Sequence, residues 1–220
     1  MDLIFTVMEY IGTVAFSVSG AMVAIHKEAD LFGVLLLSLF TAFGGGIIRD
    51  LCLGITPPSF FSPDSFPKVA ISLGAAIIVF LIALIFKHTY VKNEQKINSI
   101  NNVFDALGLG IFAVYGTQIS IVSGNTSPFI AILMGLLTGV GGGMLRDLSL
   151  GTVPFIIKKR VYAVATIFGA SVYYVLVAVL QISSVWATLA GVLSTFILRI
   201  CATVFKWNMP KAIRFSEFDK

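Results

Sequence analysis

The chain has 220 residues, of which 57% are hydrophobic and only 12% are charged, and its mean hydropathy is +0.96. A soluble domain carries about a quarter charged residues, whereas the apolar residues here gather into runs of roughly 20, the length at which a helix crosses a bilayer. These properties exclude a soluble protein, so the net charge of +4 concerns membrane orientation rather than nucleic acid.

Apolar runs between polar breaks predict seven membrane spans. In chain order they are residues 3–25, 32–53, 68–87, 102–122, 128–150, 160–181 and 184–205. The first run follows no basic segment and precedes no convincing cleavage site, so we expect a retained helix rather than a signal peptide. Three prolines between Thr56 and Asp64 exclude a helix throughout that segment. The predicted fold class is therefore an all-α integral membrane protein.

Basic residues outside the spans predict the orientation of the bundle. One side holds only Lys68. The other side holds eleven, namely Lys27, Lys87, Lys92, Lys96, Lys158, Lys159, Arg160, Lys206, Lys211, Arg214 and Lys220. The positive-inside rule places the crowded side in the cytoplasm, with the N-terminus outside and the C-terminus inside. The cluster Lys158, Lys159 and Arg160 is either part of this topology signal or a site for an anionic lipid headgroup.

An internal duplication is centred on two related segments. Residues 44–51 read Gly-Gly-Gly-Ile-Ile-Arg-Asp-Leu, and residues 141–148 read Gly-Gly-Gly-Met-Leu-Arg-Asp-Leu. Spans 1–3 therefore repeat as spans 4–6, and span 7 is extra. A repeat with an odd number of spans inserts the other way up, which gives a pseudo-two-fold axis in the membrane plane. The predicted divisions are 1–97, 98–182, 183–205 and a cytoplasmic tail at 206–220.

Inversion predicts the depth of the charged residues. In the first repeat, Glu9, Arg49 and Asp50 fall on the outer half of the membrane. Their equivalents on the inner half are Asp105, Arg146 and Asp147.

A buried charge without a partner is far more costly than a paired one. We therefore predict that Glu9 lies near Arg49 and that Asp105 lies near Arg146, as ion pairs. Adjacent helical residues point about 100° apart, so Asp50 and Asp147 are expected to find a helix end or water instead of their neighbouring arginines.

The glycine triplets, Gly44, Gly45, Gly46 and Gly141, Gly142, Gly143, have two interpretations. Small residues let membrane helices approach closely. Alternatively, each triplet breaks its helix at mid-membrane and leaves backbone groups that line a watery path. Free carbonyls would then suit a cation, and a half-helix N-terminus would suit an anion. Two symmetric triplets, each followed by Arg-Asp, favour the second interpretation.

Other polar and small residues in the spans have simpler explanations. Most hydroxyls there can bond to their own helix, and Arg199 is close enough to the cytoplasmic end of its span to snorkel. Six single glycines are expected to serve helix packing, namely Gly12, Gly20, Gly74, Gly108, Gly116 and Gly169. Cys52 and Cys201 fall on opposite sides of the membrane, so they cannot form an intrachain disulfide. No nucleophile–base pair, metal-ligand cluster or nucleotide motif supports an enzyme, and no cofactor is expected.

Seven spans in a 3+3+1 arrangement, with paired Gly-Gly-Gly-x-x-Arg-Asp-Leu segments in spans 2 and 5, resemble the prokaryotic trimeric intracellular cation (TRIC) channel family. The resemblance extends to about Phe205. It implies a homotrimer in the cell membrane, with a pore through each protomer that is lined by spans 1, 2, 4 and 5. It also implies kinks at the two triplets, where monovalent cations, mainly potassium and also sodium, would pass transiently.

The same family is also described as one of glycine transporters, and an inverted repeat suits a transporter equally well. In that alternative, Arg49 or Arg146 would bind the substrate carboxylate and exposed carbonyls would hold its ammonium group. A scaffold that transports nothing has no use for two symmetric motifs with intramembrane charge.

Overall fold

The computed structural model describes residues 3–158 and 161–207. Within them, seven helices are long and apolar enough to cross a membrane, and the described residues form helices and connecting loops without strands. The spanning helices are α1 (Leu3–His26), α2 (Leu31–Cys52), α3 (Phe66–Ile85), α5 (Glu94–Val122), α6 (Pro128–Ser149), α8 (Val161–Tyr174) and α9 (Ser184–Val204). The predicted fold class is confirmed.

Short elements connect or extend these helices. They are η1 (Ser59–Phe61), η2 (Pro63–Ser65), α4 (Lys87–Lys92), α7 (Phe155–Lys158) and the π-helical turn η3 (Val175–Val179). Together, η2 and α3 make up the third candidate span, Pro63–Ile85, and α8 with η3 makes up the sixth, Val161–Val179. The segment with three prolines folds into η1 and η2 rather than one continuous helix, as expected.

One boundary differs clearly from the sequence prediction. The fourth span was expected from residue 102, but α5 begins at Glu94. Its first two turns are polar, so the apolar run begins later than the helix does. The boundary predicted between residues 97 and 98 consequently falls inside α5. The exact residues at which the repeats begin and end stay a prediction.

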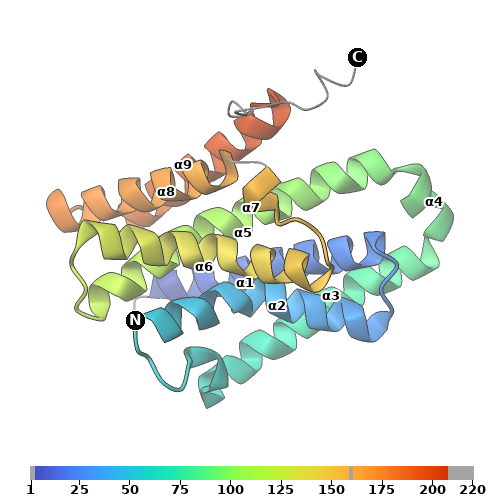
Figure 1. Cartoon of the computed structure of the whole chain (residues 1–220), viewed down its shortest axis with the longest axis horizontal. Coiled ribbons are helices and arrows are strands. Elements are labelled where there is room, and N and C mark those ends of the chain that lie inside the picture. Colours follow the sequence, from blue (N-terminus) through green and yellow to red (C-terminus); the bar gives the residue numbers. More distant parts are fainter. Residues whose placement is uncertain (1–2, 159–160, 208–220) are drawn as a thin grey trace, which may run out of the picture.

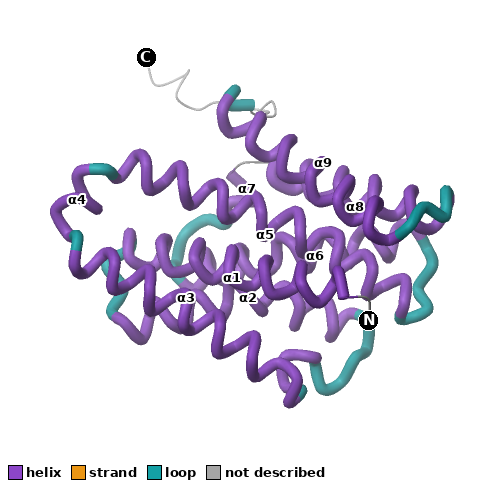
Figure 2. Tube along the Cα trace, turned by 180° about the vertical axis from the view of Figure 1, so that it is seen from behind, coloured by secondary structure: helices purple, strands orange, loops and turns teal. Residues whose placement is uncertain are grey.

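Four central helices, α1, α2, α5 and α6, pack together, with α3 on one side and α8 with α9 on the other (Figure 1). Helix α3 packs against α1 and α2, and α8 packs against α5 and α6. The view from behind shows the same separation of α3 from α8 and α9 (Figure 2). The three helices α1, α2 and α3 therefore correspond to α5, α6 and α8, and α9 lies outside the repeat.

Equivalent residues of the two repeats meet where α1 packs against α5. The rings of Phe16 and Phe112 have centroids 5.2 Å apart. A Cβ on Gly12 would lie 3.2 Å from the ring of Phe112, and one on Gly108 would overlap the ring of Phe16. Each repeat thus supplies a glycine that accommodates the phenylalanine of the other, which is what a pseudo-two-fold axis at this contact requires.

The two helices that carry the triplets begin at ordinary N-terminal signals. The Oδ1 atom of Asp30 accepts a hydrogen bond from the backbone N–H of Gly33 at 2.8 Å, which caps α2. Helix α6 begins with Pro128, whose missing N–H costs nothing in the first turn. Both starts set the register that brings the triplets to the middle of the bundle.

Candidate functional site

The glycine triplets form the crossing point of α2 and α6, which pack against each other. A Cβ on Gly45 would overlap the backbone carbonyl of Thr138, and one on Gly142 would overlap the carbonyl of Thr41. A Cβ on Gly141 would lie 2.9 Å from the Cα of Gly45. The close approach of two backbones therefore explains Gly45, Gly141 and Gly142, whereas a Cβ on Gly44 would meet the side chain of Leu145.

Helices α2 and α6 both continue through their triplets without interruption. The expectation that each triplet breaks its helix and frees its carbonyls is therefore wrong. Interior glycines cost about 1 kcal/mol each in helix propensity, but here the packing of α2 on α6 holds the helical conformation. A bend without a break at these positions stays a prediction.

The third glycine of each triplet has a different environment. A Cβ on Gly46 would lie 3.7 Å from Nη2 of Arg49, and one on Gly143 would lie 3.6 Å from Nη2 of Arg146. Both distances are ordinary van der Waals contacts. Gly46 and Gly143 thus leave space beside the arginine of their own motif rather than serving the helix crossing.

Arg49 and Asp50 form the centre of the first charge cluster. The Nε and Nη2 groups of Arg49 donate to Oδ1 of Asp50 at 2.8 and 2.6 Å. The guanidinium carbon lies 5.4 Å from the ring centroid of Tyr115 on α5, and the Tyr115 hydroxyl hydrogen-bonds Glu9. Glu9 forms its ion pair with Nζ of Lys68 at 2.7 Å.

The prediction that Glu9 lies near Arg49 is therefore supported, because Tyr115 contacts both side chains, whereas the ion pair expected between them is not formed. Lys68 extends from the first turns of α3 toward α1, while Arg49 is already engaged by Asp50. Sequence reasoning treated Lys68 only as a topology marker. The available signal was that Lys68 is the one basic residue in the loops of the predicted outer side. We name Glu9, Arg49, Asp50 and Lys68 the outer cluster, after its predicted side.

The second charge cluster consists of Asp105, Arg146 and Asp147, and we name it the inner cluster after its predicted side. The Nε and Nη2 groups of Arg146 lie 2.9 and 2.8 Å from Oδ1 of Asp147. Its Nη1 group lies 3.8 Å from Oδ1 of Asp105 and donates to the hydroxyl of Ser19 at 3.3 Å. The ion pair predicted between Asp105 and Arg146 is therefore confirmed. Asp105 also accepts from the hydroxyl of Tyr162 at 3.4 Å.

Both aspartates of the repeated motif serve two partners. Oδ2 of Asp50 accepts from the backbone N–H of Ser59 at 2.8 Å, and Oδ2 of Asp147 accepts from that of Phe155 at 2.8 Å. Ser59 and Phe155 are the first residues of η1 and α7, so the expected helix end is present. The expectation that these acids avoid their neighbouring arginines is wrong, because the flexible arginine side chain folds back over the intervening backbone.

The charges of the two motifs are enclosed by protein. Arg49, Asp50, Arg146 and Asp147 are each at most 5% exposed, and Asp105 is 6% exposed. At this depth a charge is tolerated only with hydrogen-bonding partners of opposite sign. The first cluster balances two acids, Glu9 and Asp50, against Arg49 and Lys68. The second cluster sets two acids, Asp105 and Asp147, against Arg146.

Most in-span hydroxyls bond to their own helix. Thr41 donates to the carbonyl of Leu37, and Thr138 donates to that of Met134. This agrees with the simpler interpretation of these side chains. Ser19 is an exception, because it accepts from Arg146.

The structure contradicts the roles expected for Arg199, which was to snorkel, and for Gly74, which was to serve helix packing. Arg199 is only 2% exposed, so it does not snorkel to the membrane surface. A Cβ on Gly74 would meet nothing within 4 Å, so this glycine is not required for close packing. The other five glycines assigned to packing would each bring a Cβ within 3.0 Å of a neighbour.

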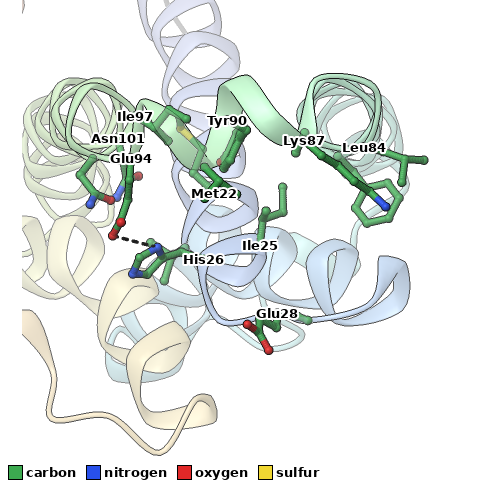
Figure 3. A pocket seen from close by; sticks show the side chains of 16 residues that line it. Met22, Ile25, His26, Glu28, Leu84, Lys87, Tyr90, Glu94, Ile97 and Asn101 are labelled. Atoms are coloured by element: carbon green, nitrogen blue, oxygen red, sulfur yellow. Dashed lines mark ion pairs between the residues drawn. The ribbon is translucent and has the colours of Figure 1, made fainter.

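A cavity of about 470 Å³ lies at one end of the bundle, between the ends of α1 and α3, helix α4 and the start of α5 (Figure 3). His26 and Glu94 form an ion pair at its rim, 3.7 Å apart. Burial raises the pKa of the Tyr90 hydroxyl, which also faces this cavity. None of the predicted site residues lines it.

Two of the three residues predicted as a possible lipid site, Lys159 and Arg160, lie outside the described residues, as does the side chain of Lys158. Among the described residues, no group of three or more His, Cys, Asp or Glu side chains is placed to hold a metal ion.

Fold and site together define a class of protein: a seven-helix membrane protein with two inverted repeats, whose buried Arg-Asp motifs flank a glycine crossing. A family model described as "Glycine transporter" matches residues 6–83 and 102–178, three helices in each repeat. The chain belongs to this family. It is 32% identical over 204 residues to the UPF0126 membrane protein YvgT of Bacillus subtilis, with 92% of this chain and 94% of YvgT covered.

A further relative, a UPF0126 membrane protein of Vibrio cholerae, is 34% identical over 92% of this chain and 80% of its own length. Solved structures of TRIC channels have the same fold. The TRIC orthologue from Rhodobacter sphaeroides has a TM-score of 0.81 at 33% identity and covers 94% of this chain and all of its own. A prokaryotic TRIC channel has a TM-score of 0.83 at 30% identity, over 95% and 100%.

Proposed function

We propose that this protein is a passive channel for monovalent cations, with potassium as the main ion and sodium also admitted. The observation that carries the proposal is the likeness to TRIC cation channels over nearly the whole chain, at 33% identity. The proposed path runs through each protomer between α1, α2, α5 and α6, past the two clusters and the glycine crossing.

The acids beside each arginine support passage of a cation. A lone arginine at 4 Å would repel a monovalent cation by about 4 kcal/mol at an effective dielectric constant of 20. Asp50 beside Arg49 offsets most of that repulsion, and Asp105 with Asp147 beside Arg146 offset it fully. Gly46 and Gly143 leave space beside each arginine. The arginines in this proposal set the conductance without closing the path to cations.

We further propose that the protein is a homotrimer in the prokaryotic inner membrane, with its N-terminus outside and its C-terminus in the cytoplasm. Lys158, Lys159 and Arg160 would then face the anionic headgroups of the inner leaflet. Native mass spectrometry of the protein in detergent should give three times the protomer mass of 23.6 kDa. A mass of one or two protomers, with channel activity retained, would contradict the trimer.

The test of the channel is planar bilayer recording with purified protein. We expect discrete openings in symmetric potassium chloride. In a potassium chloride gradient, the reversal potential should lie near that of potassium. Replacement of potassium by a large organic cation should abolish the current. A silent bilayer, with protein shown to be folded and inserted, would contradict the proposal.

A glycine transporter is the second candidate, because the matching family model is described in those words and because inverted repeats are frequent among transporters. It predicts saturable glycine uptake into liposomes that Arg49→Lys and Arg146→Lys weaken, since an ammonium group loses the bidentate contact with a carboxylate. Uptake that stays linear with glycine concentration, in liposomes that pass potassium, would exclude this alternative.

A further inference from the structure

Arg199 is a buried charged residue on α9, which lies outside both repeats. It is 2% exposed, and its Nη1 group donates to the hydroxyl of Thr203 at 2.6 Å. Its Nε and Nη2 groups have no hydrogen-bond partner among the described residues. The guanidinium carbon lies 5.1 Å from the ring centroid of Tyr162 and 5.5 Å from that of Phe155. One hydrogen bond, to the hydroxyl of Thr203, and two aromatic faces are thus the local supports of the guanidinium group.

The two rings beneath Arg199 belong to residues that bind the carboxylates of the inner cluster. Tyr162 donates its hydroxyl to Asp105, and Phe155 donates its backbone N–H to Asp147. Arg146 approaches the same two acids from α6. Asp105 is therefore placed between Arg146 on one helix and the Tyr162–Arg199 stack on two others.

Among the described residues, the charges of the two clusters balance only when Arg199 of α9 is included. In the outer cluster, Glu9 and Asp50 face Arg49 and Lys68, and Lys68 comes from α3. Helix α8 corresponds to α3, but its sequence from Val161 to Tyr174 contains no Lys or Arg. Among the residues that the structure describes, the two acids of the inner cluster would then face Arg146 alone without α9, which leaves one negative charge in excess.

We propose that Arg199 neutralises this excess, as Lys68 does in the outer cluster, and thereby sets how readily cations occupy the inner half of the path. The seventh helix then completes the charge symmetry that the second repeat lacks. This inference rests on the proposed channel function. It assigns the extra helix a specific electrostatic task, whereas a purely structural α9 would only cover the faces of α5 and α8.

The test compares Arg199→Met with Lys68→Met by patch clamp of giant spheroplasts, where biosynthesis fixes the orientation of the protein. Methionine keeps an unbranched apolar stem and removes the charge. An excess negative charge raises the local cation concentration, so each variant should pass more current when cations enter from its own side. We expect rectification of about twofold, in opposite senses for the two variants.

Two further variants separate charge from packing. Arg199→Lys keeps the charge and should retain the current–voltage relation of the wild type. Asp105→Asn in the Arg199→Met background restores neutrality, so it should restore a symmetric relation and recover the thermal stability that Arg199→Met loses.

The inference is overturned if Arg199→Met leaves rectification unchanged, or if Asp105→Asn recovers neither rectification nor stability. A silent wild type would instead refute the channel itself. The unfolding temperatures of Arg199→Met, Asp105→Asn and the double variant would then show, without any current, whether Arg199 neutralises the inner cluster.

Discussion

The three glycines of each triplet divide into two tasks at the scale of single residues. Gly45 and Gly142 sit where the backbone of the opposite helix leaves no room for a methyl group, whereas Gly46 and Gly143 face space beside an arginine. Backbone atoms cannot rotate away as a side chain can. A substitution at the second glycine must therefore separate α2 from α6, and one at the third need not.

We expect Gly45→Ala to destabilise the protein by about 1–3 kcal/mol or more, the cost of overpacking a close contact. The matched control Gly46→Ala should keep or slightly raise stability, since alanine gains up to about 1 kcal/mol of helix propensity. It should also lower the unitary conductance, because its methyl group takes the space beside Arg49. Thermal unfolding in detergent and single-channel recording measure the two effects. Equal stability of the two variants would contradict this division of tasks.

At the scale of elements, each motif ties the end of a spanning helix to the segment that follows it. Asp50 joins α2 to η1 through Ser59, and Asp147 joins α6 to α7 through Phe155. The same carboxylate also engages its neighbouring arginine. One aspartate therefore holds both the guanidinium and the returning loop, and the two repeats share this arrangement.

Asp147→Asn should release α7, because an amide gives up the charge that holds both Arg146 and the Phe155 N–H. Breaking a buried pair in this way costs about 3–5 kcal/mol. We expect faster amide hydrogen exchange at the start of α7 and a lower unfolding temperature. The exposed Asp64, which lies in η2, supplies the control. If amides at the start of α7 exchange at the same rate in Asp64→Asn and Asp147→Asn, the hydrogen bond from Phe155 to Asp147 does not hold α7 in place.

At the scale of the whole molecule, the inverted repeat and the positive charges together predict one orientation. Cys52 ends α2 and is exposed, and Cys201 lies near the end of α9. Parity of the spans places these two thiols on opposite sides of the membrane. The protein thus carries its own pair of topology reporters.

In intact spheroplasts, a membrane-impermeant maleimide should label Cys52 in a Cys201→Ala variant. In a Cys52→Ala variant, Cys201 should react only after the membrane is permeabilised. The physical reason is the positive-inside rule, which retains the Lys-rich loops in the cytoplasm. The reverse labelling pattern would invert the proposed topology, and with it the terms outer and inner for the two clusters.

The sequence by itself determined the seven helices, the inverted repeat and the pair Asp105–Arg146. Hydropathy and the duplicated motif are local or periodic signals, and burial forces a charge in each repeat to find an acid of matching depth. Only the tertiary structure decided that Glu9 pairs with Lys68, that the triplet helices remain unbroken and that Arg199 is buried. Those outcomes depend on which side chains of different helices come into contact in the folded bundle. The spacing of residues along the sequence does not give the distance between two helices in space.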